Sequence, residues 1–199
     1  MKLSMVTGLF LFITLALSCS QQEKKPEAQQ EKQQEARKDY IPVTDFIRDE
    51  IKKTDSLPVG ILKRVIKGNT SDSVFITPKE FHRLATEFLP GDLDKETFER
   101  SFNETSFLDQ TTEMFTFTYQ SKDASLAVKR VDVLMPIGQE VGQIKTVYIE
   151  KSYSRGDTAI NQKLLWKAGS NFSIITSKGI PGKQEEIQQM KVIWDPLNY

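Results

Sequence analysis

Apolar residues along the chain follow two different periods, and the change between them falls near residue 112. In the segment 44–53, Phe46, Ile47 and Ile51 recur at the spacing that places side chains on one side of a helix. Charged residues fill the positions between them, as expected on the solvent side of an amphipathic helix. The pattern therefore predicts a first helix over this segment.

The clearest helix signal follows Thr77, whose side chain can cap a first turn that Pro78 and Glu80 complete. Apolar residues at helical spacing then predict that this helix continues to residue 89, where a Pro-Gly pair ends it. A further short helix is expected over 92–102. The first part of the chain is therefore predicted to be mainly helical.

The segment 60–67 fits either a short helix or a strand, and residues 73–76 are expected to be extended. Beyond residue 112 apolar residues alternate with polar ones, which is typical of half-buried strands. The alternating sets are Phe115, Phe117 and Tyr119; Val131, Val133 and Met135; Val147 and Ile149; Ile160, Leu164 and Trp166; and Met190, Val192 and Trp194. Short turns rich in Gly, Ser and Asp separate them, so neighbouring strands are predicted to be antiparallel.

These patterns predict an α+β fold in which two to four N-terminal helices pack on an antiparallel meander of five or six strands. A cystatin-like or a lipocalin-like layout would both fit this arrangement. The segment 40–199 has a length suited to one globular domain.

One hairpin allows the predicted faces to be tested. If Arg155 and Gly156 form its loop, Val147 lies opposite Leu164, and Trp166 shares their face. The other face carries the mixed set Tyr148, Glu150, Asn161, Lys163 and Leu165. We expect that a helix partly covers this face or that the sheet curls around a cavity there. Trp166 and Trp194 are both in phase with apolar neighbours and are predicted to be core residues.

The first nineteen residues have a different character. One lysine, Lys2, precedes an apolar run over 5–17, which is shorter than the ~20 residues needed to span a bilayer. The run ends in Leu15-Ala16-Leu17-Ser18-Cys19, and Cys19 is the single cysteine of the chain. These residues resemble the lipobox of bacterial lipoproteins, although Leu17 stands where the family often has a smaller residue.

The resemblance implies that residues 1–18 are a signal peptide and that Cys19 is acylated and becomes the mature N-terminus. Cys19 would then bind membrane lipid, because a diacylated residue carries the two chains that lasting attachment requires. Residues 19–39 are rich in Gln, Glu and Lys and contain no large apolar residue, so we expect a polar tether. The absence of an acidic residue at Ser20 and Gln21 favours the outer membrane of a bacterial cell envelope over the inner one.

Charge and motifs narrow the function further. The 27 lysines and arginines balance the 27 aspartates and glutamates, so the chain has no net positive charge to attract nucleic acid. The basic cluster Lys63, Arg64 and Lys67 has no aromatic residue beside it on which bases could stack. We therefore expect no nucleic-acid partner. The single histidine, His82, is interpreted as structural because no serine elbow and no orienting partner are apparent in the sequence around it. We expect no cofactor.

Two short motifs resemble binding sites only superficially. Asp92, Asp94 and Glu96 alternate as in a calcium loop, but the glycine and glutamate required later in that loop are missing, so no metal is expected and helix capping explains the acidic residues. The tripeptide Arg155-Gly156-Asp157 is explained by a hairpin turn.

The leading hypothesis is a membrane-anchored envelope lipoprotein with a non-catalytic domain that binds a partner protein or a small apolar ligand. The alternative is a hydrolase that acts on envelope polymers through paired carboxylates, which leave no characteristic spacing in a sequence.

The Cys19→Ala substitution should abolish metabolic labelling with radioactive fatty acid and release the protein from the membrane fraction, because the acyl acceptor is lost. Labelling that persists in this variant would contradict the lipoprotein hypothesis.

Overall fold

The computed structural model describes residues 41–138, 143–195 and 197. The predicted signal peptide, Cys19 and the tether lie outside these residues. The helices described are α1 (Val43–Asp55), α2 (Pro78–Ala85) and α3 (Lys95–Ser101), with the 3-10 turns η1 (Thr86–Phe88) and η2 (Gly91–Leu93). The strands are β1 (Ile61–Lys67), β2 (Thr70–Ile76), β3 (Phe102–Asp109), β4 (Met114–Ser121), β5 (Val128–Pro136), β6 (Thr146–Arg155), β7 (Thr158–Lys167), β8 (Asn171–Gly179) and β9 (Glu186–Ile193).

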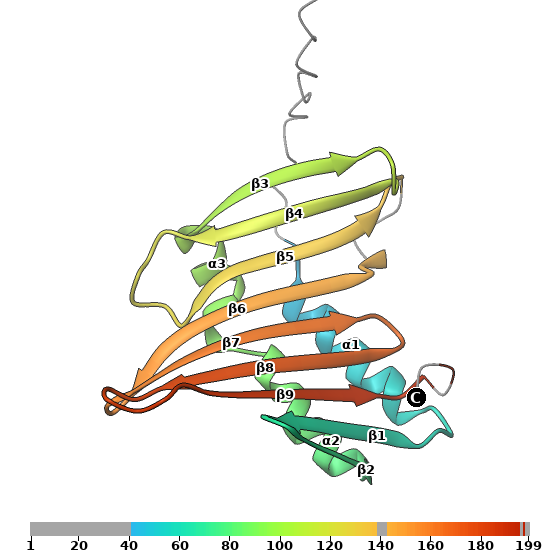
Figure 1. Cartoon of the computed structure of the whole chain (residues 1–199). Coiled ribbons are helices and arrows are strands. Elements are labelled where there is room, and N and C mark those ends of the chain that lie inside the picture. Colours follow the sequence, from blue (N-terminus) through green and yellow to red (C-terminus); the bar gives the residue numbers. More distant parts are fainter. Residues whose placement is uncertain (1–40, 139–142, 196, 198–199) are drawn as a thin grey trace, which may run out of the picture. The chain divides into compact units, whose positions relative to one another are not determined.

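All nine strands form one antiparallel sheet in the order β2-β1-β9-β8-β7-β6-β5-β4-β3. Strands β3 to β9 are therefore a continuous meander, and the β1–β2 hairpin joins it beside β9. The helices lie together against one face of this sheet (Figure 1). We call the helix-covered face the inner face and the opposite one the outer face.

The predicted α+β class and the antiparallel meander are confirmed, but the predicted strand number was wrong: the sheet has nine strands and not five or six. Strands β1 and β2 were obscured because they lie near an edge, where β2 is exposed almost throughout and no buried face imposes an alternating pattern. Strand β3 follows α3 without a loop, so the prediction that the helix continues to residue 102 concealed its start.

Strand β8 was missed for a related reason. Its central Ile174 and Ile175 are both apolar, although Ile174 is buried on the inner face and Ile175 is exposed on the outer one. A strand with apolar residues on both faces loses the period-2 signal. The sheet is also open, with β2 and β3 at its two edges, so a lipocalin-like layout, in which the sheet closes on itself, was wrong.

Helix α2 begins where the sequence predicts. The Thr77 hydroxyl accepts a hydrogen bond of 3.3 Å from the backbone N–H of Glu80, and Pro78 is the first residue of α2. This helix ends at Ala85, and the 3-10 turn η1 completes the segment predicted as one helix to residue 89. The cap fixes where Phe81 and Phe88 face the sheet.

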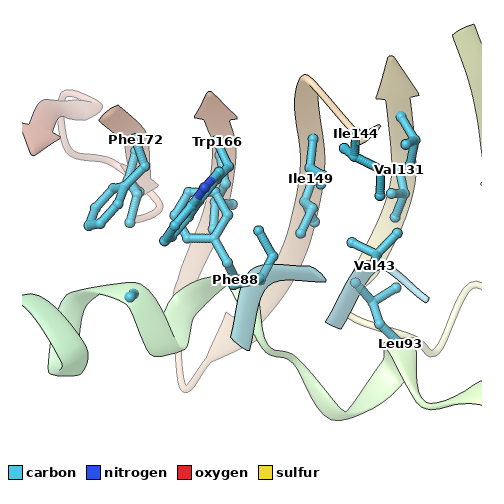
Figure 2. Packing of buried hydrophobic residues seen from close by; sticks show 14 of the residues in the cluster. Val43, Phe88, Leu93, Val131, Ile144, Ile149, Trp166 and Phe172 are labelled. Atoms are coloured by element: carbon cyan, nitrogen blue, oxygen red, sulfur yellow. The ribbon is translucent and has the colours of Figure 1, made fainter. Parts of the chain in front are cut away.

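An aromatic cluster joins this layer to the sheet. Phe88 of η1 lies edge-on to Trp166 of β7, with ring centroids 5.1 Å apart, and Trp166 stacks on Phe172 of β8 at 5.2 Å. Figure 2 shows Phe88 pointing from the helical layer toward Trp166. Phe81 of α2 completes the contact with Trp194 at 5.4 Å. All five rings are almost completely buried.

Three polar contacts fix the helical layer at further points. The Lys151 ammonium on β6 donates 2.7 Å to the Glu87 carboxylate, and the backbone N–H of Gly169 donates 2.7 Å to buried Glu50 of α1. The Asp92 carboxylate accepts 2.9 Å from the backbone N–H of Val128. Each contact gives a hydrogen-bond partner to a polar group whose burial without one would cost free energy.

The β6–β7 hairpin has the predicted faces but a different register. Val147 lies opposite Trp166 and Ile149 opposite Leu164, two residues away from the predicted pairing, because the turn residues are Gly156 and Asp157 and not Arg155 and Gly156. A shift of two residues keeps every side chain on its face. Trp166 and Trp194 are core residues, as predicted.

Replacing Trp166 by alanine should lower the free energy of unfolding by about 3–5 kcal/mol, because a large buried ring is lost from a filled core. Trp166→Phe should cost less, since the indole N–H has no hydrogen-bond partner among the described residues and phenylalanine removes that unsatisfied donor. Urea unfolding followed by fluorescence measures both. Equal losses for the two variants would contradict this reasoning.

Candidate functional site

The outer face is the face of the sheet against which no described helix lies (Figure 1). Of the two alternatives expected for this mixed face, coverage by a helix was wrong, and the sheet is open and does not close on itself. Its side chains fall into two groups by strand. A polar network extends over β4 to β7, and an apolar patch with nearby cations extends over β8, β9 and β1.

The polar network is internally paired. Asp132 on β5 accepts hydrogen bonds of 2.9 Å from Arg130 and 2.8 Å from Thr118, and the Tyr148 hydroxyl donates 3.0 Å to Glu150. The Asp132 hydrogen bond raises the pKa of Arg130, whereas burial, followed by the contact with Glu150, raises the pKa of Tyr148 to about 12. These contacts, one between β4 and β5 and two within single strands, are satisfied within the sheet and need no ligand.

The apolar group consists of Ile66 on β1, Ile175 on β8 and Ile187 on β9, which we call the isoleucine patch. The strand register places Gln189 directly opposite both Ile66 and Ile175, and Ile187 is the next outer-face residue on the same strand. The three side chains are 40%, 38% and 55% exposed. Grouped exposed isoleucines of this kind mark an interaction surface more often than isolated ones do.

Cations border this patch in an unfavourable arrangement. Arg64 on β1 lies directly opposite Lys191 on β9, so two positive side chains face each other across adjacent strands. Arg64 donates a 3.3 Å hydrogen bond to Ser73, a neutral group, and Lys191 forms no ion pair with any residue the structure describes. Like charges directly opposite each other destabilise a sheet. Lys163, opposite Ile175, adds a third positive charge, 3.9 Å from Glu150.

A hollow of about 810 Å³ lies beside the patch, between the β1–β2 turn and the start of β9. Ile66, Ile187 and Gln189 line it together with residues of the two adjoining segments. These include Glu185 and the paired Lys67 and Glu186. The hollow at this end of the outer face thus has an apolar and partly acidic lining, and Arg64 and Lys191 border the patch on the side away from it. The patch and these two cations together can bind side chains that are partly apolar and partly acidic.

The structure gives His82 a partner that the sequence did not reveal. Its Nε2 lies 2.7 Å from both carboxylate oxygens of Asp55, the last residue of α1. The pair links α1 to α2, and both side chains are partly exposed. Because these residues are far apart in the sequence, no local pattern could have indicated the contact.

The acidic residues that resemble a calcium loop serve three separate contacts. Asp92 holds Val128, the Asp94 carboxylate caps α3 by accepting 3.0 Å from the Thr97 N–H, and Glu96 lies 3.4 Å from Arg100. Hydrogen bonds from Thr97 lower the pKa of Asp94. Capping therefore accounts for Asp94. Among the described residues, no group of three His, Cys, Asp or Glu side chains is arranged to hold a metal ion.

The basic cluster noted in the sequence does not form one surface. Lys63 points to the inner face and pairs with Glu80 at 2.6 Å, Arg64 lies on the outer face, and Lys67 pairs with Glu186 at 2.5 Å. Gly156 adopts a positive φ of 58° in the β6–β7 turn, which a glycine tolerates without strain. The tripeptide 155–157 is therefore explained by the hairpin.

No known protein family, curated protein or solved structure matches this chain. In the part of the chain that the structure describes, no helix is both long and apolar enough to cross a membrane.

Removing the repulsion between Arg64 and Lys191 should stabilise the fold. Lys191→Gln is expected to raise the free energy of unfolding by about 0.2–1 kcal/mol, and Lys191→Glu by more, because it converts a repulsive pair into an attractive one. Urea unfolding at low salt measures the change, and Lys122→Gln at the other end of the sheet is the matched control. A loss of stability in both Lys191 variants would show that the opposed charges are not a strain on the sheet.

Proposed function

We propose that this protein is a membrane-anchored lipoprotein of the bacterial cell envelope whose globular domain is a non-catalytic binding module. Acylated Cys19 attaches it to the membrane, and the isoleucine patch binds a segment of a partner protein that carries acidic and apolar side chains. The observation that supports this most is the opposition of Arg64 and Lys191 beside the patch. A partner carboxylate placed between them would convert an unfavourable contact into a favourable one.

The packing of the core favours a protein partner over a small apolar ligand at the helix–sheet interface. Trp166, Phe172 and Phe88 fill the space where a ligand between the helices and strands β7 and β8 would have to lie, and they have no accessible surface. Binding there would require the aromatic cluster to separate. The isoleucine patch requires no such rearrangement, because its side chains are already exposed.

The described carboxyl groups give the hydrolase alternative little support. A glycosidase needs a general acid with a raised pKa. Where the pKa of a described carboxyl group is shifted, it is lowered by hydrogen bonds or nearby cations; these groups are Glu80, Asp94, Asp109, Asp123 and Glu186. None of them is suited to donate a proton at neutral pH.

Photocrosslinking in living cells tests the binding surface. A photoreactive amino acid placed at Gln189, the centre of the patch, should form a covalent adduct with an envelope protein at a segment containing Asp or Glu beside apolar residues. Mass spectrometry of the adduct identifies that segment. The same probe at Thr105, an exposed outer-face residue of β3, is the positional control and should give no such adduct.

The double variant Arg64→Glu/Lys191→Glu provides the matched control for charge. It retains two like charges opposite each other, so the stability of the sheet should change little, but their sign is reversed and the adduct should be lost. An adduct that survives this reversal, or that forms equally from Thr105, would contradict the proposal. Adducts to lipid or glycan alone would contradict it as well.

A further inference from the structure

A second hollow lies at the same end of the sheet, on the inner face beyond η1. The register aligns Tyr153, Ile160, Lys178 and Glu186 in one row across β6, β7, β8 and β9. Beside this row, residues at the ends of β6 and β8 and in the loop before β9 line a hollow of about 430 Å³ that is open to solvent. We call this space the tip hollow.

Three cations line the tip hollow: Arg155 at the end of β6, Lys178 on β8 and Lys183 in the loop before β9. None of them forms an ion pair with another described residue, although ion pairs are common elsewhere in this chain. Elsewhere on the inner face the lysines are neutralised: Lys63 pairs with Glu80 and Lys151 with Glu87. The tip hollow is therefore the part of this face where positive charge is concentrated.

The carboxylate that lines the hollow makes its ion pair with a lysine outside it. Glu186 pairs with Lys67, 2.5 Å away, from the neighbouring strand β1. The hydrogen bond from Lys67 is the main cause of the lowered pKa of Glu186, and the charge of Lys178, directly opposite on β8, contributes less. With three cations and one carboxylate, the lining of the hollow carries a net positive charge.

Apolar side chains form another part of the lining. Ile160 on β7 is almost buried, at 7% exposed, whereas Ile180 in the loop is 37% exposed. A ligand that satisfies both kinds of lining needs a compact anionic group and an apolar portion. Arginine and lysine together suit phosphate, since guanidinium binds two of its oxygens at once and ammonium adds a point charge.

We propose that the tip hollow binds the phosphate group of an anionic organic phosphate, with Arg155, Lys178 and Lys183 on the phosphate and the two isoleucines against its apolar portion. The phosphate can belong to a soluble ester or to a phospholipid headgroup, which share this chemistry. The site is distinct from the isoleucine patch, because its lining side chains lie on the inner face and in the adjoining turns.

The test uses the full chain in neutral detergent and follows the ³¹P resonance of two probes, sn-glycerol 3-phosphate in solution and phosphatidylglycerol in the micelles. The protein should broaden and shift the resonance of one or both probes. The variant Lys178→Gln/Lys183→Gln should weaken binding about tenfold or more, because two charge-assisted contacts are lost. The variant Lys122→Gln/Lys145→Gln carries the same change of charge away from the hollow and should bind as the wild type does.

The outcomes separate the two sources. Binding of sn-glycerol 3-phosphate supports a soluble ester, and binding of phosphatidylglycerol without it, with zwitterionic phosphatidylcholine inert, supports a lipid headgroup. An Ile180→Asn variant should then weaken the lipid more than the soluble ester. Failure of both probes to bind, or equal weakening by the Lys122/Lys145 control, would overturn the proposal. Circular dichroism of each variant confirms that the fold is retained.

Discussion

The contact on which the rest of this structure depends is the packing of Phe81 and Phe88 on Trp166 and Phe172. The sheet is wide, open and antiparallel, so its inner face has to be covered along strands that lie far from the helices in sequence. The chain achieves this with two short helical segments whose aromatic rings reach the central strands. Because the rings fill the interface completely, the helical layer is fixed on one face.

This one-sided packing leaves the outer face to serve other purposes. If stability alone had shaped that face, residues opposite each other on adjacent strands would be expected to attract. Glu150 does so with Arg130 on one side and with Lys163 on the other. The pair Arg64 and Lys191 departs from this rule within the same sheet. A local conflict of this kind, in a fold that is otherwise consistent, is where function is expected.

Sequence reasoning succeeded where the signal was local. The cap at Thr77 and the faces of Val147, Ile149 and Trp166 follow from a few neighbouring residues, and the structure confirms them. It failed where a partner far along the chain decides the outcome. The extended state of β1 depends on its pairing with β9, and the contact of His82 with Asp55 depends on how two helices dock. The isoleucine patch could not be predicted for the same reason, since its members meet only through the register of three strands.

The two proposed sites share one end of the sheet because of how the helices cover it. The Lys151–Glu87 contact holds η1 over the middle of β6, and the strands β6, β7 and β8 continue beyond it into turns that no described helix reaches. Both faces are therefore accessible there. Gln184 and Glu186 line both hollows, so the two sites are neighbours on either side of the loop before β9. A ligand that moved Gln184 or Glu186 would alter the surface presented on the other face, and binding at one site would then change the affinity of the other by the same factor in both directions.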